Sequence, residues 1–276
     1  MARSMAEVKA ALQKAFARKG GIAGVVAAEA AKLVEDHGLV DETPTLVAAF
    51  TKLGEPKRDP GCRGRIAIVA ALHTLDHWVP EVFEAGLRVV LIEGDPRYPG
   101  NDSGALVRGA CAQAHAHFNR PNALAVCAEM LADREVAARV GAARGLGDSG
   151  HIDAAAVLHY KLALASDDGE VLAACHDALF ALHRDGATEL AVRHLMLPDE
   201  RGDAAALALG SNRVIEARDD LIAFCRRDPR RRQAIGYLAL ALLRDDAANA
   251  ELERAIREGS TQDAEAAKAA LATFRT

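Results

Sequence analysis

Two short helical patterns stand next to each other in residues 123–150, and this stretch constrains the fold more than any other part of the chain. In its first half, apolar residues recur at the three- and four-residue steps that place side chains on one helical face: Leu124, Cys127, Ala128 and Leu131. After the turn around Asp133, the second half repeats this pattern with Ala138, Ala142 and Leu146. Gly147 and Gly150 then supply the stop expected after a helix. The stretch predicts a helical hairpin that is too short to fold alone.

Proline and glycine residues divide the rest of the 276-residue chain into segments of the same kind. The segments are roughly ten to sixteen residues long, which is a normal helix length. They predict helices over residues 5–19, 22–37, 44–53, 61–77, 80–93, 103–118, 121–132, 135–146, 151–165, 169–184, 187–197, 201–210, 214–227, 230–244, 247–258 and 262–274. Paired, they form about eight hairpins that begin roughly 27 to 41 residues apart, the period of a helical repeat array. We therefore expect one α-solenoid over residues 1–276, with capping hairpins near 1–38 and 247–276.

The composition favours helices that pack through small side chains. Half of the residues are hydrophobic but only 4% are aromatic, so the core must consist mainly of Ala, Leu and Val. No run of alternating β-branched or aromatic residues bounded by turns predicts a strand. The five cysteines are widely spaced and form no Cys-x-x-Cys pair, so we expect reduced thiols that fill the core. The expected fold class is all-α.

Charge and hydropathy narrow the classes of ligand and the expected location. The chain has 34 basic and 39 acidic residues, a formal net charge of −5, which argues against nucleic acid as its main ligand. Residues 1–16 carry charges every few positions, and no long apolar run follows them. We therefore expect a cytoplasmic protein that does not enter the membrane.

In three hairpins, an Asp in the turn precedes an Arg of the second helix by six positions. The pairs are Asp59 and Arg65, Asp102 and Arg108, and Asp133 and Arg139. An Asp carboxylate at this place can accept the free backbone N–H groups of the helix's first turn and also contact the Arg guanidinium. The repetition predicts a structural latch within the hairpin and not a ligand site.

With these features the chain resembles the HEAT-repeat family, including the looser repeats of bacterial phycobilin lyases. The similarity extends over roughly residues 44–210 and is clearest in Leu131-Ala132-Asp133, Arg139, Ala142-Ala143 and Leu146-Gly147. Leu172 departs from the pattern because an Arg is expected there, and residues 187–210 are shortened. The resemblance implies a bacterial, right-handed α-solenoid whose second helices line a concave surface.

Four histidines near the ends of two second helices form the first candidate site. His73 and His77 are four residues apart on one helix, while His115 and His117 lie on the second helix of the next hairpin. Together with Asp76 they offer nitrogen and carboxylate ligands of the kind that open metal sites use. The alternative is a set of ordinary surface histidines that interact with helix C-termini. We expect no metal and no cofactor.

Five arginines around the turn at Asp228-Pro229 form the second candidate site: Arg226, Arg227, Arg230, Arg231 and Arg232. Their guanidiniums could bind phosphate or an acidic partner, helped by the backbone N–H groups of the helix that starts near Arg230. The alternative is a solvated helix end, in which Arg226 and Arg227 offset the dipole of the preceding helix.

The connection over residues 93–102 is the third candidate site because it is longer than the other turns. Long loops on a rigid scaffold often carry functional side chains, and this one would present Arg97 and Tyr98. The alternative is a spacer that absorbs a change in the pitch of the array.

Motifs of nucleotide-binding and hydrolytic enzymes are absent from the sequence. It contains no G-x-x-x-x-G-K-[ST], G-x-S-x-G or H-E-x-x-H. It also lacks any His-Glu dipeptide, which removes a resemblance to HEAT-repeat iron hydroxylases. We therefore expect no catalytic residues.

The leading functional hypothesis is a non-enzymatic scaffold that binds a protein or peptide on the concave face of the array. The residues expected to face the partner lie on second helices: Arg63, His73, His77, His115 and Arg144. The first alternative is a lyase-like enzyme, or a subunit of one, that handles a small chromophore or cofactor in the concave groove. The second alternative, nucleic-acid binding, is disfavoured by the charge balance.

Overall fold

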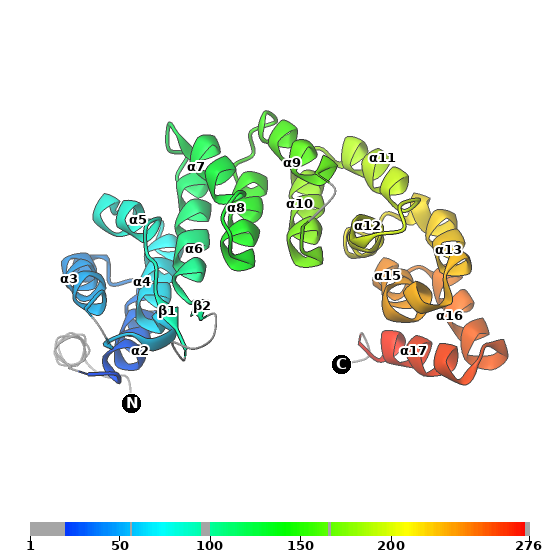
Figure 1. The fold of residues 1–276 in the computed structure, drawn as a ribbon, viewed down its shortest axis with the longest axis horizontal. Helices are drawn as coiled ribbons and strands as arrows, with labels where there is room; N and C mark the ends of the chain where they lie inside the picture. The colour runs from blue at the N-terminus through cyan, green and yellow to red at the C-terminus, as the bar shows by residue number, and fades with distance from the viewer. Residues whose placement is uncertain (1–19, 56, 95–99, 165–166, 274–276) are drawn as a thin grey trace. The chain divides into compact units, whose positions relative to one another are not determined.

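The computed structural model describes residues 20–55, 57–94, 100–164 and 167–273, and within them the chain is all-α (Figure 1). The longer helices of the first half are α2 (Ala23–Asp36), α3 (Thr43–Leu53), α4 (Arg63–Thr74), α5 (Pro80–Gly86), α6 (Gly104–His117), α7 (Ala123–Met130) and α8 (Val136–Asp148). Those of the second half are α9 (Ala154–Ala163), α10 (Gly169–Leu182), α11 (Arg184–His194), α12 (Glu200–Ser211), α13 (Arg218–Arg227), α15 (Tyr237–Leu243), α16 (Asp246–Glu258) and α17 (Thr261–Ala272). The expected fold class is confirmed, while the expected helix over 5–19 lies outside the described residues.

Short helical turns precede several of these helices. Single turns of 3-10 helix occur at η1 (Val40–Glu42), η2 (Pro60–Cys62) and η3 (Ile215–Ala217). The expected helix over 230–244 is built from three pieces: α14 (Pro229–Arg231), the π-helix η4 (Arg232–Gly236) and α15. A π-turn inserts one residue per turn, so it changes which side chains share a face.

The expected helix over 80–93 is wrong in its second half. Helix α5 ends at Gly86, and β1 (Ile92–Glu93) instead pairs antiparallel with β2 (Asn101–Asp102). Side chains capture the backbone of this segment: Arg108 donates to the Val89 carbonyl at 2.6 Å, and the Leu91 N–H donates to Asp102 at 2.8 Å. These bonds replace those that a continued helix would make.

The described chain divides into two compact units, one ending at Gly145 and one starting at Leu146. We refer to them as the N-terminal and C-terminal units. The division falls within α8. The single array and the capping hairpins expected over residues 1–276 remain predictions.

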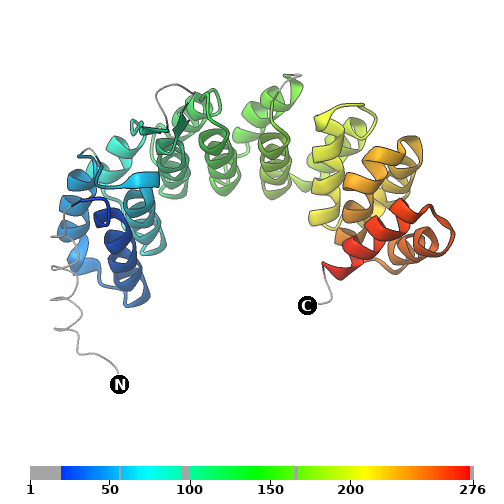
Figure 2. The ribbon, with the colours of Figure 1, turned by 60° about the horizontal axis from the view of Figure 1, so that its bottom comes forward.

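In the N-terminal unit, the second helix of each hairpin packs against the second helix of the next. Helix α4 lies between α2 and α6, while the first helices α3 and α5 pack on α4 and α6 (Figures 1 and 2). The backbones of the second helices approach closely at glycines. A Cβ added to Gly64 would lie 2.9 Å from the Gly24 carbonyl oxygen, and one added to Gly141 would lie 2.5 Å from the Gly109 backbone. Only glycine fits such contacts.

The C-terminal unit repeats this arrangement. Helices α10, α12, α15 and α17 pack in succession, and α9, α11, α13 and α16 pack beside them. Gly210 touches the Ala239 backbone, where an added Cβ would lie 2.4 Å from the carbonyl oxygen. Gly147 lies inside α8, so the prediction that it stops a helix is wrong. Gly147 instead lets the backbone of α8 contact that of α10, because an added Cβ would lie 2.9 Å from the Ala178 Cα.

Leucine, alanine and a few phenylalanines fill both cores. The largest fully buried side chains include Leu46, Leu72 and Phe83 in the N-terminal unit, and Leu158, Leu172 and Phe224 in the C-terminal unit. All five cysteines are buried free thiols, which confirms the role predicted for them. Among the described residues, no helix combines the length and the apolarity needed to cross a membrane.

Candidate functional site

Asp59, in the turn before α4, contacts Arg65 in the first turn of that helix. The Asp59 carboxylate accepts the N–H of Gly64 at 2.8 Å and that of Arg65 at 3.1 Å, and it also accepts the Arg65 Nε at 3.2 Å. Both side chains are buried. The carboxylate thus caps α4 and fixes an arginine at the same time, which is a structural role.

Arg108 connects two hairpins. Its Nη1 donates to Asp102 at 2.8 Å, while its Nε and Nη2 donate to Asp133 at 2.8 and 2.9 Å. Burial would raise the pKa of the Asp133 carboxyl, but hydrogen bonds from Arg108 and the Glu135 N–H outweigh it and hold that pKa below its usual range. The pKa of Asp102 is also lowered. Burial would raise it, but hydrogen bonds from the Leu91 N–H and Arg108 outweigh this effect. The buried arginine is therefore balanced by a carboxylate from each hairpin.

The third pair meets through different atoms. The Arg139 Nη1 donates to the carbonyl oxygens of Asp133 and Arg134, each at 2.8 Å. The Asp133 carboxylate accepts the Glu135 N–H at 2.9 Å besides its bonds from Arg108. The pattern of Asp and Arg six residues apart therefore produces three different sets of contacts.

The four histidines of the first candidate site differ in their contacts and in their burial. The His73 and His117 rings meet edge to face, 4.3 Å apart, and the His117 Nε2 lies 3.1 Å from the Asp76 carboxylate. His115 is buried, and its Nδ1 lies 2.8 Å from the Cys111 carbonyl oxygen. His77 is half-buried. In the described part of the chain, no group of three or more His, Cys, Asp or Glu residues is placed to hold a metal ion.

His115 belongs to an aromatic cluster and not to a surface. Its ring meets Trp78 edge to face at 4.9 Å, and Trp78 stacks on Phe83 at 4.9 Å. The Arg120 guanidinium lies 4.8 Å from the Trp78 ring centre, within the range of a cation–π contact. Burial lowers the pKa of His115, which favours the neutral ring. The expectation that His115 faces a partner is therefore wrong.

The five arginines of the second candidate site point to separate partners. Arg231 donates to Asp203 at 2.6 Å and to the Leu197 carbonyl at 2.8 Å, while Arg227 donates to the Leu195 carbonyl at 2.8 Å. Arg232 binds Asp263, and Arg226 lies 3.9 Å from Glu251. Arg230 is exposed. The turn is thus tied to neighbouring hairpins, and its guanidiniums do not converge on one phosphate.

Of the remaining predicted residues, Arg63 and Arg144 are exposed on the second helices α4 and α8. Arg97 and Tyr98 lie outside the described residues.

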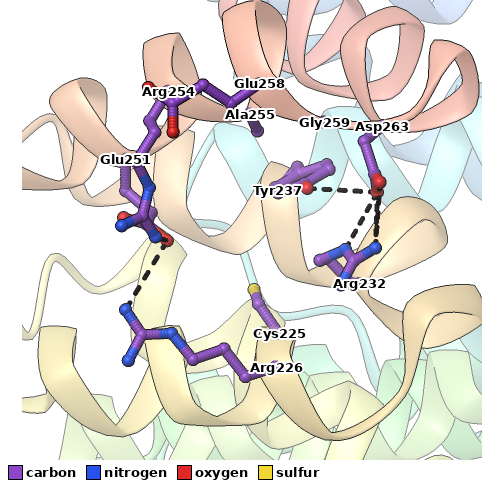
Figure 3. A pocket seen from close by; sticks show the side chains of 10 residues that line it. All are labelled: Cys225, Arg226, Arg232, Tyr237, Glu251, Arg254, Ala255, Glu258, Gly259 and Asp263. Carbon is purple, nitrogen blue, oxygen red and sulfur yellow. Dashed lines mark hydrogen bonds and ion pairs between the residues drawn. The ribbon is translucent and has the colours of Figure 1, made fainter.

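A pocket of about 220 Å³ opens in the C-terminal unit between α13, η4, α15, α16 and α17 (Figure 3). Three arginines and three acidic residues line it, together with a thiol, a phenol and two small residues: Arg226, Arg232, Arg254, Glu251, Glu258, Asp263, Cys225, Tyr237, Ala255 and Gly259. The volume is below the roughly 300 Å³ at which pockets for drug-sized ligands begin. It suits a single side chain or a small molecule.

One wall of the pocket is organised around the buried carboxylate of Asp263. Arg232 donates to it at 2.9 and 3.0 Å, and Tyr237 donates at 3.2 Å (Figure 3). Gln233 donates to it at 3.1 Å. The Ser260 hydroxyl donates at 2.8 Å within the capping box of α17. Arg232, Gln233 and Tyr237 occupy positions i, i+1 and i+5 of the chain. The π-helix η4 turns these three side chains to the same side.

This network sets the ionisation of the wall. Burial would raise the pKa of Asp263, but hydrogen bonds from Ser260, Gln233 and Arg232 hold it far below its usual range. Burial raises the pKa of Tyr237 to about 12 and that of Cys225 to about 12, so both stay protonated at neutral pH. The pocket therefore holds a thiol that is a poor nucleophile, and its features favour binding over covalent chemistry.

On the opposite wall, two arginines share a single carboxylate as their ion-pair partner. Arg254 and Arg226 both approach the same oxygen of Glu251, Arg254 closely and Arg226 at 3.9 Å. The Arg226 side chain is 65% exposed. Two guanidiniums thus share the carboxylate of Glu251, and Arg226 is the more distant of the two.

A second pair of histidines lies in the C-terminal unit, at positions that the sequence does not mark as a site. His176 is fully buried on α10, and its Nε2 lies 3.3 Å from the Nδ1 of His194. Burial, followed by the charges of His194 and His159, lowers the pKa of His176 to about 3. His194 is half-buried, and burial lowers its pKa as well, so both rings favour the neutral form at physiological pH.

The site residues predicted from the sequence include Arg226 and Arg232 but none of the other charged residues of the pocket. The Ser260-x-x-Asp263 spacing is a capping-box signal that could have located Asp263 at the start of a helix. The helical periodicity gives no signal for Glu251, Arg254 or Tyr237. These residues line the pocket because α15 and α16 pack next to α13 and α17.

Comparison of the chain with protein-family models and with curated proteins found no match.

Proposed function

We propose that the chain is a right-handed α-solenoid of HEAT-like repeats and acts as a non-enzymatic scaffold that binds a protein or peptide on its second helices. The observation that carries this proposal is the successive packing of second helices within each unit. Such stacking buries one side of every hairpin. The outward side chains of the second helices then form a continuous row within each unit.

Two features support the repeat architecture. Backbones of neighbouring second helices meet at glycine or alanine, as at Gly109 with Gly141 and at Gly210 with Ala239. Ion pairs also join consecutive hairpins, as between Arg108 and Asp133. Both kinds of contact recur from hairpin to hairpin, as in a solenoid whose units contact only their neighbours.

The chemistry of the described residues supports binding over catalysis. Burial raises the pKa of the thiols of Cys62, Cys111, Cys175 and Cys225, which makes them poor nucleophiles. Arginines that would favour a nucleic acid are occupied by carboxylates and carbonyl oxygens, as Arg231 and Arg232 are. Exposed residues of second helices, such as Arg63 and Arg144, are available to a partner.

The test begins with affinity capture by the immobilised full chain, followed by measurement of Kd with the purified partner. We expect a double Arg63→Ala, Arg144→Ala variant to bind the partner about tenfold or more weakly, since each arginine is placed on a second helix. Lys52→Ala, an exposed substitution on the first helix α3, is the matched control and should leave Kd unchanged. Absence of a stoichiometric partner, or equal effects of both variants, contradicts the proposal.

A further inference from the structure

The pocket of the C-terminal unit has two chemically distinct parts. Its interior is formed by the Cys225 thiol, the Ala255 methyl and the Tyr237 ring, all with little or no charge (Figure 3). Its rim carries the guanidiniums of Arg226 and Arg254. An apolar body would fit inside while an anionic end remains at the rim.

The rim has one more positive charge than it has acidic partners within ion-pair distance. Arg254 contacts Glu251 closely, and Arg226 reaches the same oxygen at the long distance of 3.9 Å. Within the described chain, Glu251 is the single carboxylate within 4.0 Å of Arg226. An incoming carboxylate could therefore accept hydrogen bonds from Arg226 without displacing a strong ion pair.

Arg232, the third arginine of the pocket, is already bound to a carboxylate. The Nε and Nη2 of Arg232 donate to the two oxygens of Asp263, which also accepts hydrogen bonds from the Tyr237 and Ser260 hydroxyls. This wall is therefore rigid and neutral. It positions the Tyr237 ring as a fixed side of the pocket.

Glu258 also lines the pocket and opposes an anion. It is exposed at the end of α16, and in the described structure no Lys, Arg or His lies within 4.0 Å of its carboxylate. Its negative charge lowers the affinity for a carboxylate and raises that for a cation. Removal of this charge therefore distinguishes an anionic from a cationic ligand.

We infer that the pocket binds a carboxylate carried on a short apolar body, as at the C-terminus of a peptide that ends in an aliphatic residue. The volume of about 220 Å³ fits such a terminal residue and is small for a cofactor. The inference rests on the proposed function for its peptide source, whereas the carboxylate chemistry rests on the pocket alone. A free short-chain acid presents the same chemistry, so the experiment includes both sources.

The experiment titrates the full chain with acetyl-Ala-Ala-Leu-Leu as the free acid, the same peptide as its C-terminal amide, and isocaproate. Binding is followed by the shifts of the backbone amide resonances of Ala255 and Gly259. We expect the free acid to bind at least about tenfold more tightly than the amide, the value of one charged hydrogen bond. Arg226→Ala should weaken binding of the free acid about tenfold. Glu258→Gln should strengthen it.

Arg257→Ala is the control for charge alone. Arg257 lies on the same helix, is exposed and pairs with Glu253 outside the pocket at 3.7 Å, so its loss should leave the affinity unchanged. Equal binding of the acid and the amide overturns the inference but leaves peptide binding by the chain in place. Weaker binding of the free acid by Glu258→Gln overturns it too, since the Glu258 carboxylate would then favour binding of the acid instead of opposing it. Binding of isocaproate without the peptide acid supports the carboxylate chemistry and rejects the peptide as its source.

Discussion

Arg108 and Asp133 lie 25 positions apart in the chain and are joined by two hydrogen bonds, of 2.8 and 2.9 Å. The same guanidinium also binds Asp102, the turn residue of its own hairpin, at 2.8 Å. One buried arginine thus fixes two successive hairpins to each other. The sequence motif predicts a latch inside a hairpin, whereas the structure shows that it also acts between hairpins.

Loss of this arginine should destabilise the fold strongly. We expect Arg108→Ala to lower the free energy of unfolding by about 3–5 kcal/mol, because the buried Asp102 carboxylate then keeps only the exposed guanidinium of Arg134, 3.6 Å away, as its cation. Urea denaturation followed by circular dichroism measures the change. Arg63→Ala, an exposed arginine of the neighbouring second helix, should change it by less than about 0.5 kcal/mol. A loss below about 1 kcal/mol for Arg108→Ala would contradict the structural role assigned to it.

Close backbone packing predicts an unusual response to a helix-favouring substitution. Gly141→Ala should lower the free energy of unfolding by about 1–3 kcal/mol, since the new Cβ would lie 2.5 Å from the Gly109 backbone. Gly169→Ala is the control, because its added Cβ would have its nearest neighbour, a Glu200 oxygen, at 3.8 Å. The control should be neutral or stabilising. If Gly141→Ala were equally harmless, the second helices would not pack at this distance.

His176 predicts a loss of stability in mild acid. Its pKa is about 3 in the folded chain and 6.5 as an ordinary value, so below pH 6.5 the unfolded chain binds the proton first. The free energy of unfolding should therefore fall as the pH drops from about 6.5 toward 3, by up to about 1.4 kcal/mol per pH unit from this residue. His176→Leu should flatten this slope, whereas His37→Ala, an exposed control, should not. Identical slopes for wild type and His176→Leu would count against a buried neutral His176.

Asp263 predicts a second pH dependence of the same sign at lower pH. Its pKa is held below the ordinary value of 3.8, so the stability it contributes is present above that pH and is lost as the pH falls further. Asp263→Asn should cost about 2–3 kcal/mol at pH 7, because Arg232 loses its partner. Thermal unfolding measures the loss, with Glu265→Gln on the same helix as the control. Equal melting temperatures for the two variants would show that the Asp263 network does not stabilise this wall.

The periodicity of apolar residues located most helices to within a few residues. It did so for α2, α3 and α6, because proline and glycine punctuate the chain and the buried stripe follows the helical repeat. It failed at residues 87–93, where Arg108 and Asp102 capture the backbone from across the turn. A contact between distant residues leaves no local periodic signal.

The candidate sites were harder to predict than the helices. A run of arginines such as Arg230, Arg231 and Arg232 reads as one basic patch, yet Asp203 and Asp263 bind two of them from positions 28 and 31 residues away. The π-helix η4 also rotates Arg232 and Tyr237 to one side, which an ideal helical wheel does not show. The position of His115 on its helix predicts an exposed side chain, because the sequence does not show that the Trp78 ring packs against it.

Oxidative footprinting of the full chain with and without its captured partner tests the proposed function most directly. Leu106 on the second helix α6 is 51% exposed, while Tyr160 on the first helix α9 is 67% exposed. A partner bound along the second helices should protect Leu106 from labelling and leave Tyr160 as reactive as in the free chain. Protection of Tyr160 with Leu106 unchanged would contradict binding on the second helices.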